Sequence, residues 1–240
     1  MSGKTSSGEL LVGRINDPHD LKRIYSSFDE YVSHQRGKED SPKAYRGLYE
    51  QLKDSCDVLM GFLSGQRERI LDIGARDGGA VSYFNAKSYA ALGVELSPKL
   101  VEYCKERDIP VYAGDMHNLQ WVDNSFDAIF AKDVLEHSYD PHRALIEWSR
   151  VLRVGGILYI ECPCLDYNYA FHSYEFRSPE MLKGIVSGVL DVVPVHEREY
   201  FTCQTMFSYT VRLKSKKVKY CADKTYPAND PEDKKTDGRS

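Results

Sequence analysis

The sequence predicts an α/β fold: a doubly wound, mostly parallel seven-stranded sheet with an antiparallel C-terminal hairpin and N-terminal lid helices. First, short apolar runs alternate with amphipathic stretches, which is typical of strands joined by crossover helices. Second, the runs are almost continuously apolar, as expected of parallel strands covered on both faces. Third, the alternation stops after Ser187, where two strand-like runs follow each other with only a short polar link.

Five apolar runs have the length and β-branched content of strands. They are Arg69–Ile73, Ala90–Glu95, Ile109–Ala113, Phe126–Ala131 and Gly156–Cys162. Because helical stretches separate them, successive runs are expected to be parallel and joined by right-handed crossovers.

Three helices are expected to begin in the same way, with a capping side chain before a proline at the first helical position. These starts are Ser97-Pro98, Asp140-Pro141 and Ser178-Pro179. Gly155-Gly156 is expected to end the second of these helices and to lead into the next strand.

The chain is predicted to divide into three parts. Leu190–Val195 and Tyr200–Leu213 should form a hairpin, because the link His196–Glu199 is too short for a crossover helix. Asp17–Ser33 and Pro42–Leu63 look helical. We therefore predict an N-terminal tail with lid helices over residues 1–64 and a core over 65–213. Residues 214–240 are charged and poor in aliphatic side chains, which predicts a disordered tail.

Composition excludes several classes of protein. The 240 residues include 32 Lys and Arg and 36 Asp and Glu, for a net charge of −4. A nucleic-acid partner is therefore not expected, because such proteins usually carry a basic face and a high pI. The polar N-terminus lacks the apolar segment of a signal peptide, and no apolar run approaches the ~18 residues of a membrane span. We expect a cytoplasmic protein whose cysteines are reduced.

No metal site is expected from residue spacing. Cys162-Pro163-Cys164 is a single close pair, and one such pair does not make a four-ligand zinc site. A magnesium site assembled from loops that include Asp133 stays an alternative.

Candidate ligand-binding residues lie at the ends of three successive strands, where open α/β sheets bind their ligands. The first strand leads into Asp72-Ile-Gly74-Ala75-Arg76-Asp-Gly78-Gly79, whose glycines let the backbone approach a ligand. The second ends in Glu95, a carboxylate that can accept both hydroxyls of a ribose. The third ends in Gly114-Asp115-Met116, where a carboxylate can accept an amino proton of a purine. Each feature is weak alone, but together they form a much stronger set.

These segments resemble, in order and spacing, the motifs of class I S-adenosylmethionine-dependent methyltransferases, whose fold is Rossmann-like. The resemblance runs from about Arg69 to Pro163, through ILDIGARDGG, GVELSP, AGDMHNL, FDAIFAKDVLEH and VLRVGGILYIECP. A shorter and less specific stretch, His172 with the residues from Tyr174 to Glu180, resembles the branch that methylates sugars and other small molecules.

The resemblance implies a role for each matching residue in binding S-adenosylmethionine. The methionine part would lie on the loop of Gly74, Ala75, Arg76 and Gly78, with Asp72 shaping that loop or receiving the ammonium group.

The adenosine part would be bound by the next two strand ends. Glu95 would take the ribose hydroxyls with Leu96 against the adenine, and Asp115 would meet the adenine amino group with Met116 on the ring. Lys132 would open the loop that lines the donor site. Arg46 would pair with the cofactor carboxylate or an anionic substrate, or lie on a solvated helix face.

Methyl transfer from a sulfonium is an in-line displacement, so the protein must align donor and acceptor, exclude water and remove any acceptor proton. Histidine titrates in the right range for that base. His137 and His172 are the catalytic candidates because both follow strands on the expected ligand side, although either can be structural. The other histidines, including His117, His142 and His196, are expected at the surface or at caps.

Arg76 departs from the family pattern, which usually has glycine at this position. If the position needs a positive φ, arginine costs roughly 1–2 kcal/mol. Alternatively, the guanidinium can bind the cofactor carboxylate. The predicted function is methyl transfer to a small-molecule hydroxyl or amine, such as a sugar. A protein or RNA methyltransferase, and a catalytically silent protein of the same fold, stay open as alternatives. A nicotinamide dehydrogenase is disfavoured, because Gly74, Gly78 and Gly79 lack the G-x-G-x-x-G register.

Tyrosine is unusually frequent, with 17 Tyr against 9 Phe and 2 Trp. Several lie in the two segments that usually form the lid over the acceptor in the fold this chain resembles: Tyr25, Tyr31, Tyr45, Tyr49, Tyr167, Tyr169 and Tyr174. Because tyrosine has an apolar ring and a polar tip, we expect a half-wet pocket for a ring-shaped acceptor.

Overall fold

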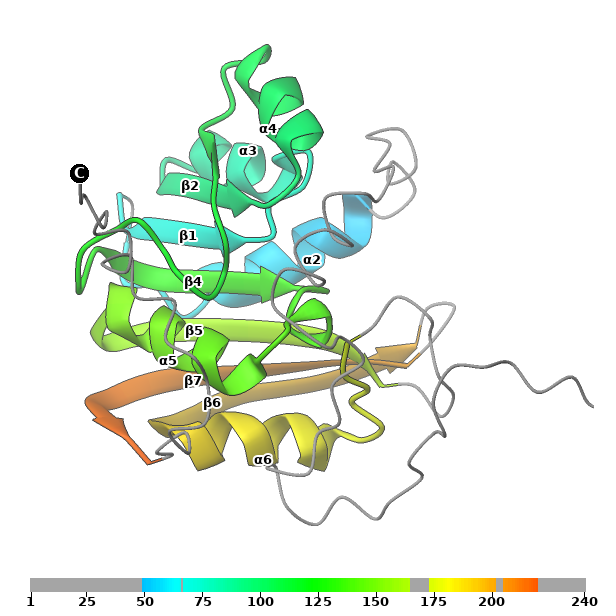
Figure 1. Cartoon of the computed structure of the whole chain (residues 1–240), viewed down its shortest axis with the longest axis vertical. Helices are drawn as coiled ribbons and strands as arrows, with labels where there is room; N and C mark the ends of the chain where they lie inside the picture. The colour runs from blue at the N-terminus through cyan, green and yellow to red at the C-terminus, as the bar shows by residue number, and fades with distance from the viewer. Residues whose placement is uncertain (1–48, 66, 165–172, 202–204, 220–240) are drawn as a thin grey trace, which may run out of the picture.

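The predicted fold class is confirmed by the computed structural model, which describes residues 49–65, 67–164, 173–201 and 205–219. Its seven-stranded sheet has the order β3-β2-β1-β4-β5-β7-β6 (Figure 1). The strands are β1 (Arg69–Ile73), β2 (Ala90–Glu95), β3 (Val111–Ala113), β4 (Phe126–Lys132), β5 (Leu152–Cys164), β6 (Leu190–Phe201) and β7 (Thr205–Val218).

The strand directions bring the carboxyl ends of the parallel strands to one edge of the sheet. β1 pairs in parallel with β2 and β4, β2 with β3, and β4 with β5, whereas β7 is antiparallel to both β5 and β6. The parallel strands point to the right in Figure 1, so their carboxyl ends share that edge. The chain order reverses between β1 and β4, and such a switch point is where open sheets bind ligands.

Five helices and one 3₁₀ turn accompany the strands in the described residues. They are α2 (Tyr49–Met60), α3 (Gly79–Ala86), α4 (Pro98–Lys105), η3 (Leu135–His137), α5 (Pro141–Val151) and α6 (Pro179–Val189). The predicted proline starts of α4, α5 and α6 are confirmed. The predicted capping bond forms only in α5, where Asp140 accepts from the backbone N–H groups of His142 and Arg143. Ser97 and Ser178 make no such bond.

Alternate residues of the central strands pack on opposite faces of the sheet. Ile70 and Tyr159 belong to the core that includes residues of α2 and α3, whereas the next residues along the chain, Leu71 and Ile160, belong to the core with α5 and α6. Burial on both faces explains why the strand sequences are almost continuously apolar.

Gly155-Gly156 does not end helix α5, as the sequence suggested. The helix ends at Val151, and β5 begins immediately at Leu152. Gly155 has a φ of +79°, and the pairing of β5 with β4 shifts register between Leu152 and Ile157. The glycines therefore form an irregularity within the strand, which begins earlier than predicted.

The prediction of a hairpin link at His196–Glu199 was wrong. These residues lie inside β6 and pair with Phe207–Thr210 of β7. β6 is an edge strand, and from His196 to Phe201 its half-buried residues alternate with exposed ones because one face meets solvent.

Strand β7 continues to Val218, past the predicted start of the C-terminal tail at residue 214. Ser215 Oγ donates to Asp191 Oδ2 at 2.7 Å, and Lys216 Nζ contacts backbone carbonyls at the C-terminal end of α5. Side-chain hydrogen bonds thus help to hold residues 214–218, whose one aliphatic residue is Val218.

The predicted helix Asp17–Ser33, the start of Pro42–Leu63 and the chain after residue 219 lie outside the described residues. The division into three parts stays a prediction. No helix in the described ranges is long and apolar enough to cross a membrane.

Candidate cofactor site

The loop after β1 contains three residues with positive φ. These are Gly74 at +70°, Arg76 at +51° and Gly78 at +74°. A Cβ on Gly78 would lie 2.5 Å from Ile109 Cγ2, and one on Gly74 would lie 2.7 Å from Val134 Cγ2. Both conformation and space therefore require glycine at the two outer positions.

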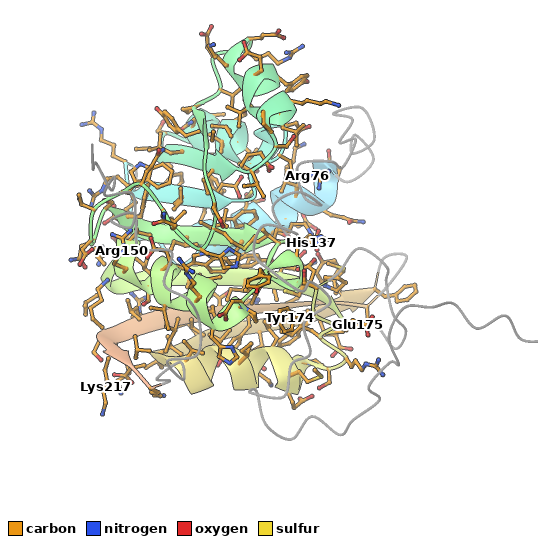
Figure 2. The ribbon with its side chains drawn as sticks, in the orientation of Figure 1. Arg76, His137, Arg150, Tyr174, Glu175 and Lys217 are labelled. Atoms are coloured by element: carbon orange, nitrogen blue, oxygen red, sulfur yellow. The ribbon has the colours of Figure 1, made fainter. Side chains whose placement is uncertain are left out.

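Arg76 has the left-handed conformation that the sequence raised as a possibility. Its backbone N–H donates to Glu95 Oε2 at 3.0 Å, and its carbonyl lies 3.4 Å from Cys104 Sγ. These bonds hold the arginine in a strained position. Figure 2 shows Arg76 and His137 at the same end of the sheet, whereas Arg150 lies at the opposite end.

Glu95 ties two of the predicted binding loops together. Its Oε1 accepts from the backbone N–H of Ser97 at 2.8 Å, while Oε2 accepts from Arg76. The side chain is buried, and Leu96 beside it is half-buried. Because each carboxylate oxygen has two lone pairs, Glu95 retains capacity to accept from a ligand hydroxyl.

Three acidic side chains, Asp72, Asp77 and Glu95, interact electrostatically at this loop. Asp72 is buried, and its pKa is raised mainly by burial and then by the charges of Glu95 and Asp77. A cation would relieve this repulsion and lower the pKa of Asp72. S-adenosylmethionine carries two cationic groups, an ammonium and a sulfonium, so the residues present fit that cofactor.

His117 is buried, contrary to the predicted surface or capping position. Its Nδ1 lies 2.6 Å from Asp115 Oδ1, which also accepts from the backbone N–H of His117 at 2.9 Å. The backbone N–H of Asp140 and the hydroxyl of Ser138 both approach Nε2, at 3.3 and 2.7 Å. Since an amide N–H can only donate, Nε2 accepts and Nδ1 donates to Asp115.

The hydrogen bonds from His117 influence the pKa of Asp115, the carboxylate predicted to bind the adenine. Burial acts to raise the pKa of Asp115, but the hydrogen bonds from His117 and the charge of Arg143 outweigh it and lower the pKa. Met116 packs against the core, and its carbonyl accepts from Trp148 Nε1 at 3.1 Å. Asp115 and His117 are two residues apart, and this spacing was the feature of the sequence that could have predicted the hydrogen bond between their side chains.

Lys132 lies in a hydrogen-bonded cluster that sequence reasoning missed. Its Nζ contacts Glu161 Oε1 and donates to Asp133 Oδ2 at 2.9 Å. Glu161 also accepts from Tyr200 OH at 2.6 Å, from Ser55 Oγ at 2.9 Å and from the hydroxyl of Tyr159.

The charges in this cluster stabilise each other. Burial acts against the charged forms, but Lys132 lowers the pKa of Glu161, and Asp133 and Glu161 together raise the pKa of Lys132. Residues from α2, β4, β5 and β6 meet here, and no local motif indicates such a meeting.

The 3₁₀ turn η3 is hydrogen-bonded to Ser173 and Tyr174, in the segment that precedes α6. The backbone N–H groups of Ser173 and Tyr174 both donate to the carbonyl of Glu136, and Ser173 Oγ donates to the carbonyl of His137. The Glu136 side chain is buried, and burial together with the charge of Asp133 raises its pKa to about 8.

Two aromatic residues of this segment are buried, so they do not line a half-wet pocket. Tyr174 is 5% exposed and its hydroxyl donates to the carbonyl of Tyr139, while Phe176 is 1% exposed. Tyr174 and Glu175 are labelled in Figure 2. The predicted site residues His172 and Arg46 lie outside the described residues, as do most of the tyrosines assigned to the lid and the side chain of Tyr49.

The described part of the chain contains no group of three or more His, Cys, Asp or Glu side chains that could hold a metal ion.

Comparison with known proteins supports the family that the sequence resembles. Residues 71–160, which include the glycine loop and the strands from Leu71 of β1 to Ile160 of β5, match the family model described as a methyltransferase domain. This match over 90 of the 240 residues, together with relatives named as methyltransferases, supports a class I S-adenosylmethionine-dependent methyltransferase. The methyl donor of this family is S-adenosylmethionine, as the cofactor prediction stated.

Curated relatives of this methyltransferase domain include enzymes named for small acceptors. The chain is 27% identical to 27-O-demethylrifamycin SV methyltransferase of Amycolatopsis mediterranei, over 76% of this chain and 73% of that enzyme. It is 29% identical to glycine/sarcosine/dimethylglycine N-methyltransferase of Actinopolyspora halophila, over 59% of this chain but only 28% of the relative. It spans 48% of an uncharacterized protein from a Streptomyces fradiae transposon.

A solved structure agrees in fold. The 1,6-didemethyltoxoflavin-N1-methyltransferase of Burkholderia thailandensis, with its acceptor and S-adenosylhomocysteine bound, superposes with a TM-score of 0.59 at 18% identity. The match covers 81% of this chain and 95% of that one.

Proposed function

We propose that this chain transfers a methyl group from S-adenosylmethionine to the hydroxyl or amine of a small molecule by in-line displacement. The observation that carries the proposal is the set of carboxylates at the ends of three adjacent parallel strands, Asp72, Glu95 and Asp115, around a loop with positive φ. A cationic nucleoside suits such a site, because the carboxylates can take its ammonium, ribose hydroxyls and amino group in turn.

Each predicted cofactor residue keeps its role in this proposal. Glu95 accepts the ribose hydroxyls while its bonds to Arg76 and Ser97 hold it in position. Both hydrogen bonds from His117 use Oδ1 of Asp115, which leaves Oδ2 for the adenine amino group. His137 is proposed to face the reaction zone, as is His172.

The acceptor is proposed to be a ring-shaped small molecule such as a sugar. Relatives named for rifamycin and toxoflavin precursors support a small cyclic acceptor. A cytoplasmic location is part of the proposal and is supported by free thiols at Cys56, Cys104, Cys162 and Cys164.

Calorimetry of the whole chain with S-adenosylmethionine and S-adenosylhomocysteine tests the proposal. We expect both compounds to bind. If neither binds at millimolar concentration, the proposal is overturned.

A catalytically silent protein is the second candidate, because Arg76 departs from glycine in the cofactor loop. The fold alone does not decide between them, because the structure of a [4+2]-cyclase also superposes, with a TM-score of 0.56 at 16% identity. Binding of the cofactor without transfer of its labelled methyl group to any acceptor would favour this second candidate.

A further inference from the structure

Asp133 follows β4 directly, at the carboxyl end of a central strand, and its backbone is strained. Its φ is +53°, a left-handed conformation that is unfavourable for a non-glycine residue. Its N–H donates to the carbonyl of Glu161 at 2.9 Å. Strained residues cluster at ligand sites, and this one lies at the edge where open α/β sheets bind ligands.

One oxygen of the Asp133 carboxylate is fixed by its neighbours. Oδ2 accepts from Lys132 Nζ, and that ammonium is anchored by Glu161, which has no exposed surface. Glu161 is in turn held by Tyr200 of β6 and Ser55 of α2. The position of Oδ2 is therefore determined by bonds that reach three other elements of the fold.

The other oxygen, Oδ1, is buried although the side chain as a whole is 41% exposed, and it accepts no hydrogen bond from any described residue. Most buried polar atoms have a partner, so such an atom at a ligand-binding edge indicates a donor supplied by a ligand. The charged groups that act on this carboxyl are Lys132, Glu161, Glu136 and Arg76. Its pKa is raised: burial is the largest cause, Lys132 opposes it, and Glu161 adds to it.

Asp133 also adjoins the cofactor loop. Val134, the next residue, packs so closely on Gly74 that a Cβ there would lie 2.7 Å from Val134 Cγ2. The charge of Arg76 acts on the Asp133 carboxyl from the same loop. Asp133 therefore lies between the residues proposed to bind the donor and the cluster of Lys132 and Glu161.

We propose that Asp133 Oδ1 accepts a hydrogen bond from the acceptor's O–H or N–H and takes its proton during methyl transfer. This inference rests on the proposed function. As the acceptor oxygen or nitrogen forms its bond to the methyl carbon, the carbon–sulfur bond breaks and its electron pair goes to sulfur, which becomes a neutral thioether. The acceptor's proton goes to Oδ1, so Asp133 takes the role of base for which the sequence suggested His137 or His172.

The test compares Asp133→Asn with Asp108→Asn in the full chain. Asp108 is a matched control, because it is also an aspartate with positive φ, at +54°, but lies exposed after α4. Calorimetry should give both variants an affinity for S-adenosylmethionine within about threefold of wild type. Radiolabelled methyl transfer to a panel of a hexose, a hydroquinone and a primary amine should slow at least about 100-fold in Asp133→Asn alone, mainly in kcat.

A second readout does not depend on the acceptor. In protein with ¹³C-labelled aspartate, the carboxyl carbon of Asp133, assigned from its loss in Asp133→Asn, should titrate at a pH clearly above the ordinary aspartate range. Titration of Asp133 within that ordinary range, or an Asp133→Asn variant that keeps more than about a third of the transfer rate, would overturn this inference. Failure of the wild-type chain to bind S-adenosylmethionine would instead overturn the proposed function.

Discussion

Replacing Glu95 with alanine should destabilise the protein even without ligand, because its carboxylate joins two loops. The substitution removes an anionic acceptor from the backbone N–H groups of Arg76 and Ser97. A hydrogen bond to a charged group contributes about 1.5–3 kcal/mol, and two such bonds are lost. Relief of the repulsion that raises the pKa of Asp72 offsets part of this loss.

A net cost of about 3 kcal/mol is therefore expected, which corresponds to a fall in Tm of about 6–12 °C for a chain of this size. Differential scanning calorimetry without ligand measures it. Glu102→Ala is the control, because Glu102 lies exposed on α4 and its pairing with Lys105 should contribute less than about 1 kcal/mol.

The same variant separates the structural role of Glu95 from its role in binding. If Glu95 also accepts the ribose hydroxyls, calorimetry should show S-adenosylmethionine binding weakened by about 1–3 kcal/mol. A ligand-free Glu95→Ala protein that melts within about 1 °C of wild type would refute the claim that this carboxylate joins the loops.

Three further predictions concern backbone conformation, pH and burial. Gly78→Ala should lower the free energy of unfolding by about 2–4 kcal/mol, because Gly78 has a positive φ and a Cβ there would clash with Ile109. Gly184→Ala, in the middle of α6 where no neighbouring atom is close, should raise it by about 0.5–1 kcal/mol. Thermal melts of the two variants measure the difference. Glu136 keeps its proton to about pH 8 in the folded state but only to about 4.5 when unfolded, so its contribution to the free energy of unfolding should fall as pH rises through that window. Glu136→Gln should therefore gain stability over wild type from pH 5 to pH 9, and an equal difference at both pH values in urea titrations would contradict this. His117→Ala should cost about 2–4 kcal/mol in urea denaturation, because it leaves Asp115 and Ser138 without their buried partner.

Apolar periodicity predicted the strands that are buried on both faces. The bounds of β1 and β2 agree with the sequence prediction, because most residues of each strand are apolar and four in each are buried. β6 was divided wrongly at His196–Glu199, because an edge strand meets solvent and can carry polar residues without losing its pairing.

The candidate site was predictable only where its residues are close in sequence. The loop from Asp72 to Gly78 and the ends of β2 and β3 follow from strand positions alone. The cluster around Glu161 joins Ser55 to Tyr200, and only the packing of α2 and β6 against β5 brings these hydroxyls together. His117 looked like a surface residue because its partner Ser138 lies far away in the chain.

The end of strand β7 sets a practical limit on how the protein can be shortened. Lys216 places its ammonium on the carbonyls of Ser149, Arg150 and Leu152, and Lys219 Nζ donates to the carbonyl of Ser187 in the last turn of α6. Two lysines of the C-terminal segment thus neutralise the negative ends of two helices that precede them in the chain. A fragment designed for crystallisation that stopped at Leu213 would uncover both helix ends, whereas one that stopped after Lys219 would keep them covered.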